Sequence, residues 1–255
     1  MTNDERMAAE AARRLRDGAV CLVGIGLPST AANLARLTHA PNLVLIYESG
    51  TIGSKPQVLP LSIGDGELAD TADAVVSVPE IFAYWLQGGR IDVGLLGAAQ
   101  IDRFGNLNTT VIGDYEHPAT RLPGGGGAPE IAAAAKEVFI IMKQSVRSCV
   151  DRLDFVTTAG YFTGGQSRSH SGAPGAGPTC VITDLGVMEP HPETKELTLT
   201  HLYPGVEVSH VLAATGWPLA VAENITCTPA PSPETLRILR ELNSRTKTAH
   251  GGKGS

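Results

Sequence analysis

The chain has 255 residues, of which 42% are hydrophobic and 18% charged, and its formal net charge is −6. This acidic balance argues against a nucleic-acid-binding protein, which usually carries a basic face, and no segment approaches the run of about 18 apolar residues that crosses a membrane. The four cysteines are widely spaced without a CxxC pair, which indicates reduced thiols in the cytoplasm and neither disulfides nor a zinc site.

The pattern at the start of the chain predicts an amphipathic helix. Apolar residues such as Met7, Ala11 and Leu15 recur at helical spacing. We expect a cap at Asn3 or Asp4 to begin this helix and Gly18 to end it.

Buried strands and further helices alternate along the rest of the chain. Short apolar runs, typical of buried strands, follow at residues 19–26, 43–49, 74–78, 93–98, 138–142, 155–158 and 180–184. Helical patterns occur at residues 28–37, 79–87, 207–215 and 233–242, and a short helix is predicted near Pro129.

This alternation predicts an open α/β fold with a mostly parallel sheet that helices cover on both faces. No composition break or linker divides the chain, so we expect one domain over residues 1–243. Residues 160–177 are rich in Gly and Ser and predict a surface loop. Residues 244–255 predict a polar, disordered tail.

The 29 glycines cluster beside the ends of the predicted strands. Ligands of open α/β sheets bind at the carboxyl ends of the strands, where glycine lets the backbone approach them closely. Most of these glycines are equally explained by tight turns. The first notable cluster, GIGLPST at residues 24–30, resembles a nucleotide-binding loop, but Ser29 stands where that motif has its last glycine, so we do not predict a dinucleotide site.

A single carboxylate, Glu48, follows the second predicted strand in the segment YESGTIG. A surface glutamate at the start of a loop is the simpler interpretation. The six preceding residues carry no charge, however, so we expect part of the side chain to lie near the edge of the core. Burial would raise the pKa of this carboxyl and remove its hydration, which makes a carboxylate a better nucleophile toward a carbonyl group.

Four consecutive glycines, Gly124 to Gly127, precede the short helix predicted near Pro129. Exposed backbone N–H groups in such a loop can form an oxyanion hole, and a flexible loop is an equally good interpretation from composition alone. Nearby acidic residues and a histidine lack a recognised ligand spacing, so we predict no metal. These residues are Asp102, Asp114, Glu116 and His117.

In this order, the three segments resemble the β half of the class I CoA-transferases, a family that includes glutaconate, acetoacetate and 3-oxoadipate CoA-transferases. GIGLP is similar to the family's Gly-x-Gly-x-Pro loop, YESGTIG to its catalytic Glu-x-Gly segment, and GGGGA at residues 124–128 to its glycine-rich oxyanion segment. The patterns AQID-x-x-GN-x-N, IGDY-x-HP-x-TR and TD-x-G…ETK at residues 99–108, 112–121 and 183–195 make the chain most like the β subunit of the glutaconate type. The likeness covers roughly residues 5–240.

The resemblance implies that Glu48 attacks an acyl-CoA and carries CoA as a transient thioester, with no tightly bound cofactor and with CoA as a substrate. It assigns Gly126, Gly127 and Ala128 to stabilising the oxyanion and binding the acyl-CoA. We expect further residues to line the substrate or CoA pocket: Gly24, Gly26, Pro28, Gly50, Gln100, Asn106 and Asn108. Arg121 is a candidate for binding a substrate carboxylate, although a structural role is equally good.

The resemblance also implies a partner, because a chain of this length is half of the family's working unit. We expect an α subunit, an α2β2 heterotetramer, and a carboxylic acid, dicarboxylic or 3-oxo, as the second substrate. Two alternatives remain: a CoA-thioester hydrolase or ring-cleaving enzyme of the steroid-degradation type on the same scaffold, and a silent partner subunit without catalytic residues.

Overall fold

The computed structural model describes residues 1–251 of the chain. Contacts divide it into two compact units, one containing Met1–Leu95 with the segment that begins at Pro231, and the other Leu96–Ala230. Each unit contains both helices and strands, and the predicted α/β class is confirmed. The single domain predicted over residues 1–243 stays a prediction. No helix in the described part has the length and hydropathy needed to span a membrane.

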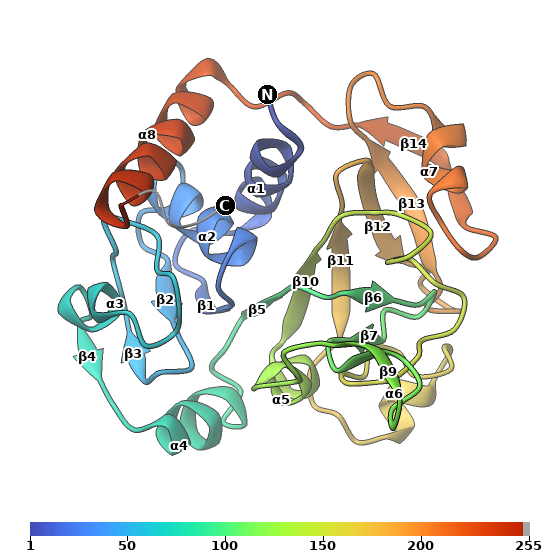
Figure 1. Cartoon of the computed structure of the whole chain (residues 1–255), viewed down its shortest axis with the longest axis horizontal. Coiled ribbons are helices and arrows are strands. Elements are labelled where there is room, and N and C mark those ends of the chain that lie inside the picture. Colours follow the sequence, from blue (N-terminus) through green and yellow to red (C-terminus); the bar gives the residue numbers. More distant parts are fainter. Residues whose placement is uncertain (252–255) are drawn as a thin grey trace. The chain divides into compact units, whose positions relative to one another are not determined.

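Three helices of the first unit pack against one another: α1 (Asn3–Arg14), α2 (Leu27–Leu37) and α8 (Pro233–Ala249), as Figure 1 shows in blue and red. Thr2, and not Asn3 or Asp4, caps α1. The Thr2 hydroxyl accepts the Glu5 N–H at 3.1 Å, and the Glu5 carboxylate accepts the Thr2 N–H at 2.8 Å. The predicted cap was therefore wrong, because only Thr2 has a glutamate three residues later with which to form this reciprocal pair.

The sheet of the first unit is built on parallel strands. β1 (Val20–Val23) lies between β2 (Val44–Ile46) and β5 (Val93–Leu96) and is parallel to both. β3 (Thr51–Ile52) and β4 (Ala74–Val75) extend it in antiparallel orientation. The side chains of β1 and β5 are almost all buried, as continuous apolar runs in parallel strands require.

Short helical segments connect β3, β4 and β5. α3 (Gly66–Asp70) precedes β4, and α4 (Val78–Glu80) continues into a π-helical turn, η1 (Ile81–Leu86). These two consecutive segments confirm the helix predicted at residues 79–87. The run at residues 74–78 forms only the two-residue strand β4, whose side chains are exposed.

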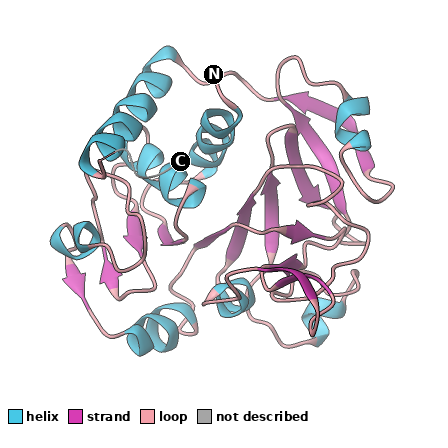
Figure 2. Cartoon of the chain, in the orientation of Figure 1, coloured by secondary structure: helices cyan, strands magenta, loops and turns pink. Residues whose placement is uncertain are grey.

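In the second unit, β10 (Glu137–Ile141) and β11 (Pro178–Ile182) are parallel. β12 (Gly186–Pro190) joins β11 and β13 (Leu197–Leu202) in antiparallel orientation, and β14 (Ala220–Cys227) is parallel to β13. Figure 2 shows these strands side by side in magenta. α7 (Val208–Ala213) connects β13 to β14.

Two hairpins and two short helices complete the second unit. β6 (Gln100–Ile101) pairs with β7 (Leu107–Asn108), and β8 (Val111–Gly113) pairs with β9 (Pro118–Arg121). α5 (Ala128–Ala134) is the helix predicted near Pro129, and α6 (Ser167–His170) lies in the glycine-rich segment.

Three predictions from local composition were wrong. Residues 155–158 form no strand apart from a single bridge at Thr158. Residues 160–177 are not simply a surface loop, because they contain α6 and the buried side chain of Arg168. The predicted tail is helical through Ala249, since α8 continues past residue 243, whereas residues 252–255 lie outside the described part.

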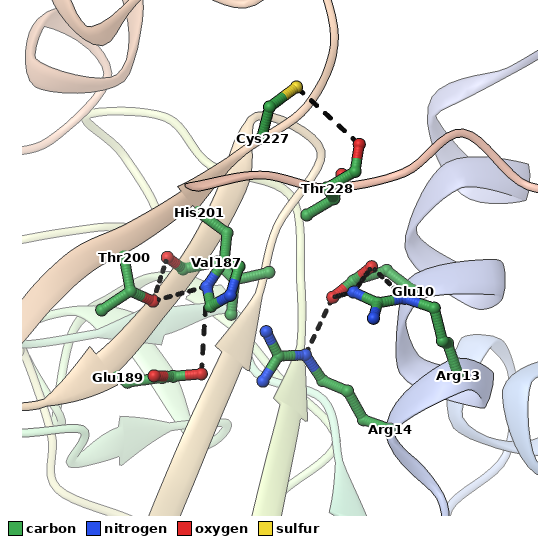
Figure 3. A network of polar contacts seen from close by, with 9 residues as sticks. All are labelled: Glu10, Arg13, Arg14, Val187, Glu189, Thr200, His201, Cys227 and Thr228. Carbon is green, nitrogen blue, oxygen red and sulfur yellow. Dashed lines mark hydrogen bonds and ion pairs between the residues drawn. The ribbon is translucent and has the colours of Figure 1, made fainter. Parts of the chain in front are cut away.

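Each unit also holds a polar network that Figure 3 shows from close by. On α1, the buried carboxylate of Glu10 accepts hydrogen bonds of 2.8 Å from Arg13 and from Arg14, which compensate for its burial. In the second unit, Nδ1 of His201 lies 2.8 Å from the hydroxyl of Thr200 and 4.0 Å from the Glu189 carboxylate.

Candidate active site

Glu48 lies in the tight turn between β2 and β3, directly after the carboxyl end of a parallel strand. The turn is closed by the Gly50 N–H, which donates to the Tyr47 carbonyl at 3.0 Å. The Tyr47 N–H donates in turn to the Thr51 carbonyl at 3.1 Å. The side chain of Glu48 is half-buried, as expected from the uncharged residues before it. A strand end of this kind presents a side chain where open α/β sheets bind their ligands.

The Gly24–Gly26 loop lies at the same edge of the sheet as Glu48. Strands β1 and β2 are parallel with Leu22 opposite Ile46, so both chains leave the sheet at the same level. The Gly24 N–H donates to the Leu95 carbonyl at 3.2 Å, which fixes the start of this loop on β5. Two segments that the sequence singled out separately are thus brought together by the strand register.

Gly26 has a φ of +85° and ends the loop as the N-cap of α2, with Pro28 in the first turn of that helix. A left-handed backbone is costly for any residue with a side chain, so this position requires glycine. Proline is favoured there because the first helical N–H groups have no partner within the helix. The conformation of GIGLP is therefore explained by local structure. A role for Gly24, Gly26 and Pro28 in a substrate or CoA pocket stays a prediction.

Tyr47, the residue before Glu48, is completely buried and points toward α2. Its phenol oxygen lies 2.9 Å from the Ser29 hydroxyl and accepts a hydrogen bond of 3.4 Å from the Asn33 side chain. Burial raises the pKa of the Tyr47 phenol, although both hydrogen bonds oppose this shift. The phenol is therefore neutral at physiological pH and acts as a hydrogen-bonding group.

The glycine-rich loop of the second unit is fixed at both ends. The Gly124 N–H donates to the Thr109 carbonyl at 2.8 Å, and Gly127 is the N-cap of α5. The Ala128 N–H donates to the Gly125 carbonyl at 3.0 Å and is therefore engaged. Within the described residues, no acceptor receives the N–H groups of Gly126 or Gly127.

Gln100 and Asn108 are buried partners across the β6–β7 hairpin. Asn108 donates to the Gln100 side-chain oxygen at 2.7 Å and to the Val111 carbonyl at 2.6 Å, and its own oxygen accepts the Thr110 N–H at 2.9 Å. Gln100 donates to Asp154 at 3.1 Å. These hydrogen bonds hold the hairpin and the start of β8, and pocket roles for the two side chains stay predictions.

Asn106 is a second buried amide with every polar atom engaged. It donates to Asp102 at 2.7 Å and to the Phe162 carbonyl at 2.8 Å, and its oxygen accepts the N–H groups of Gly160 and Phe162 at 2.8 and 3.1 Å. Burial raises the pKa of Asp102, although hydrogen bonds from Asn106 oppose the shift. Asn106 thus joins the β6–β7 turn to the glycine-rich segment, and its predicted place in the pocket stays a prediction.

Arg121 is exposed at the end of β9. Its guanidinium lies 4.9 Å from the centre of the Tyr115 ring and donates to the Tyr115 carbonyl at 2.9 Å. Asp114 accepts the N–H groups of Glu116 and His117, both at 2.9 Å, and so organises the hairpin turn. Among the described residues, no three acidic, histidine or cysteine side chains are grouped to hold a metal ion.

The residues that sequence analysis missed are polar side chains buried inside helices. Ser29 and Asn33 lie one turn apart on α2, and both are buried within an apolar face. Their i, i+4 spacing was the available signal, because it places both side chains on one face of the helix. Without the position of Tyr47, however, nothing in the sequence identified what these two residues contact.

Comparison with known proteins gives consistent results over nearly the whole chain. The family model described as coenzyme A transferase matches residues 5–214. The chain is 61% identical over 253 residues to the β subunit of 3-oxoadipate CoA-transferase from Pseudomonas knackmussii, a match that covers 99% of this chain and 97% of that protein. It is 36% identical over 248 residues to the β subunit of glutaconate CoA-transferase from Acidaminococcus fermentans, covering 94% and 91%.

A solved structure has the same fold. The crystal structure of glutaconate coenzyme A-transferase from Acidaminococcus fermentans matches with a TM-score of 0.90 and 33% identity, and the match covers 97% of this chain and 96% of that one. The order of helices and strands found here is therefore shared with this enzyme.

Proposed function

The chain belongs to the coenzyme A transferase family, and we propose that it carries the nucleophile, Glu48, of a two-subunit enzyme that moves CoA between two carboxylic acids. The resemblance to the class I CoA-transferases is confirmed. Of the two named relatives, the 3-oxoadipate enzyme is more similar than the glutaconate enzyme to which the motifs pointed. The observation that carries the proposal is the half-buried Glu48 in its closed turn at the carboxyl end of β2.

The proposed reaction begins when a Glu48 carboxylate oxygen attacks the thioester carbonyl of the donor acyl-CoA. The C–S bond breaks, CoA leaves as a thiolate, and an acyl–glutamyl anhydride remains. The thiolate then attacks the Glu48 carbonyl carbon, the C–O bond of the anhydride breaks, and the donor acid leaves as a carboxylate. The product is a Glu48–CoA thioester, and an acceptor carboxylate reverses both steps without net consumption of water or protons.

Each tetrahedral intermediate in this sequence carries negative charge on an oxygen atom. We propose the N–H groups of Gly126 and Gly127 as its hydrogen-bond donors, because no acceptor in the described part of the chain uses them. The loss of one such donor typically costs about 2.7–4 kcal/mol in the transition state. The predicted contribution of Ala128 is reduced to helix N-terminal packing, since its N–H is already bound to Gly125.

The proposed acid substrate is a dicarboxylic 3-oxo acid. The support is the name of the relative that shares 61% of its residues with this chain over 99% of the length. The identity of a family fixes the chemistry more firmly than the substrate, because substrate contacts differ among members of one fold. The structure offers no observation that favours the hydrolase or the silent partner.

The proposed partner is an α subunit, with two copies of each chain in the working enzyme. The support is that both named relatives are one of two kinds of subunit in their enzymes and that the chain covers more than nine-tenths of each. We propose a cytoplasmic location on the basis of its cysteines, none of which forms a disulfide in the described part, and three of which are buried as thiols.

Mass spectrometry of the assembled two-subunit enzyme, quenched during turnover, tests the proposal. We expect a CoA adduct on the peptide that contains Glu48, formed with acyl-CoA alone and removed when an acid acceptor is added. The Glu48→Ala enzyme should form no adduct and show no transfer. Turnover by that variant at the wild-type rate, or an adduct on another residue, would refute the role of Glu48.

A further inference from the structure

We propose that Tyr47, Ser29 and Asn33 form a positioning lock, a buried hydrogen-bonded cluster that fixes the turn carrying Glu48 against helix α2. This inference rests on the proposed function of Glu48 as the nucleophile. None of the three side chains needs to touch substrate. Their role is to set where the neighbouring carboxylate is held.

The first step is the coupling of Tyr47 to the turn. Its N–H and its carbonyl are both hydrogen-bonded within the turn, to Thr51 at 3.1 Å and to Gly50 at 3.0 Å. Its side chain is 0% exposed and extends away from the turn into the unit. A shift of the Tyr47 ring therefore moves the backbone from which the Glu48 side chain begins.

The second step is the anchorage on α2. Tyr47 Oη lies 2.9 Å from Ser29 Oγ, and Asn33 Nδ2 lies 3.4 Å from both hydroxyl oxygens and donates to the Ser29 carbonyl at 2.9 Å. Arg36 Nη2 lies 3.3 Å from the remaining Asn33 oxygen and also donates to the Pro56 carbonyl at 2.9 Å. Each member of the lock has at least one partner, which makes a buried polar cluster rigid and specific.

The third step is that packing alone does not explain this cluster. Tyr47 follows the apolar run of β2, and the face of α2 around Ser29 and Asn33 is otherwise apolar. A phenylalanine opposite alanine or leucine would bury the same surface without three polar groups that must be satisfied. Hydrogen bonds specify one position of the ring, whereas apolar contacts tolerate several. The lock therefore supplies positional precision more than stability.

The fourth step connects precision to chemistry. A displacement of about 1 Å in a reacting group can reduce the rate about 100-fold. A misplaced carboxylate also leaves room for water, which would hydrolyse the anhydride or the thioester and divert transfer to hydrolysis. Loss of the lock should consequently change the ratio of hydrolysis to transfer, a quantity that a simple loss of folded protein leaves unchanged.

The test is Tyr47→Phe in the assembled two-subunit enzyme, which removes only the hydroxyl. We expect kcat for transfer to fall about 10-fold or more, with KM for acyl-CoA changed by less than about twofold. CoA release without an acid acceptor, measured with a thiol reagent and divided by the transfer rate, should rise. The matched control is Tyr161→Phe, which removes a buried phenol that donates to the Pro178 carbonyl at 2.8 Å in the other unit. This control should leave the ratio unchanged.

Substitutions on the helix side complete the test. Ser29→Ala should reproduce the raised hydrolysis ratio, and Ser29→Thr, which keeps the hydroxyl, should restore it toward the wild-type value. In the Tyr47→Phe/Ser29→Ala enzyme the two effects should be less than additive, because both act through one hydrogen bond.

Two outcomes separate failure of the lock from failure of the proposed function. If Glu48→Ala abolishes transfer while Tyr47→Phe gives the same kcat and hydrolysis ratio as Tyr161→Phe, the lock is refuted and the nucleophile stands. If Glu48→Ala retains wild-type transfer, the nucleophile is refuted, and the lock with it.

Discussion

The Val76 N–H donates a hydrogen bond of 2.9 Å to the carbonyl oxygen of Gly50, two residues after Glu48. Val76 directly follows β4 and closes over Gly50, so that a Cβ atom at this position would overlap the Val76 carbonyl. Gly50 also has a φ of +104°, a conformation that residues with side chains rarely adopt. The Glu48 turn is thus clamped against this strand at one end and against α2 through Tyr47 at the other.

The first prediction concerns Gly50→Ala. We expect the variant to lose about 3 kcal/mol of unfolding free energy, because backbone strain and overlap with Val76 add. Gly18→Ala is the matched control: Gly18 also has a positive φ, +76°, but nothing lies within 4 Å of the added Cβ, so only about 1 kcal/mol should be lost. Urea unfolding measures both. Equal losses would mean that the Val76 contact yields without cost.

The second prediction concerns the length of the nucleophile. Glu48→Asp withdraws the carboxylate by one methylene group and leaves space for water beside it. We expect transfer to fall and hydrolysis of acyl-CoA to rise relative to transfer, which a thiol-release assay with and without acceptor acid will show. Glu48→Gln is the control, since it keeps the length but removes the nucleophile and should support neither reaction. An unchanged ratio in the aspartate variant would contradict the proposed exclusion of water.

The third prediction concerns Arg168, a buried arginine whose guanidinium is held by backbone carbonyls. It donates to the carbonyls of Gly175, Gly160 and Ala132 at 2.9, 2.8 and 2.6 Å. Burial lowers its pKa, and the three carbonyl acceptors compensate for the buried charge. Arg168→Lys should destabilise the chain by about 2–4 kcal/mol, because an ammonium group cannot reach three divergent acceptors.

The control for Arg168→Lys is Arg237→Lys on the exposed face of α8, where the arginine pairs with Glu234 and Glu241. Surface ion pairs contribute little, so its urea midpoint should remain at the wild-type value. If the two lysine variants unfold at the same urea concentration, Arg168 does not hold the glycine-rich segment.

The fourth prediction concerns acid stability. The hydrogen bond from Arg240 lowers the pKa of Glu5 from 4.5 to about 2. A carboxyl with a depressed pKa in the folded state stabilises the fold fully above its unfolded pKa and loses this contribution as the pH falls toward the folded pKa. Glu5→Gln should therefore be less stable than wild type at pH 7. The difference should shrink from about pH 4.5 downward and vanish near pH 2.

Urea unfolding at several pH values checks this prediction, and glutamine keeps the hydrogen bond that caps α1. Arg240→Gln should give the same pH dependence, since it removes the largest cause of the shift. A constant difference between wild type and Glu5→Gln across this pH range would show that the carboxylate is not coupled to folding.

Local patterns predicted the elements whose burial follows from short-range sequence. β1, α2, β5 and β10 lie where apolar runs and helical spacing placed them, because their side chains face the core whatever their neighbours are. Prediction was wrong where distant segments decide the structure. The glycine-rich segment 160–177 contains α6 because Arg168 finds carbonyl acceptors from other parts of its unit.

By itself, the sequence determined the α/β class, the family and the candidate nucleophile, because these depend on residue types in short, ordered segments. Only the tertiary structure decided that Tyr47 bonds Ser29 and Asn33, that Val76 closes over Gly50, and that Asn106 and Asn108 spend their amides within the chain. The physical reason is that a hydrogen bond requires its two groups within about 3 Å. Sequence spacing does not encode that proximity for residues on different elements.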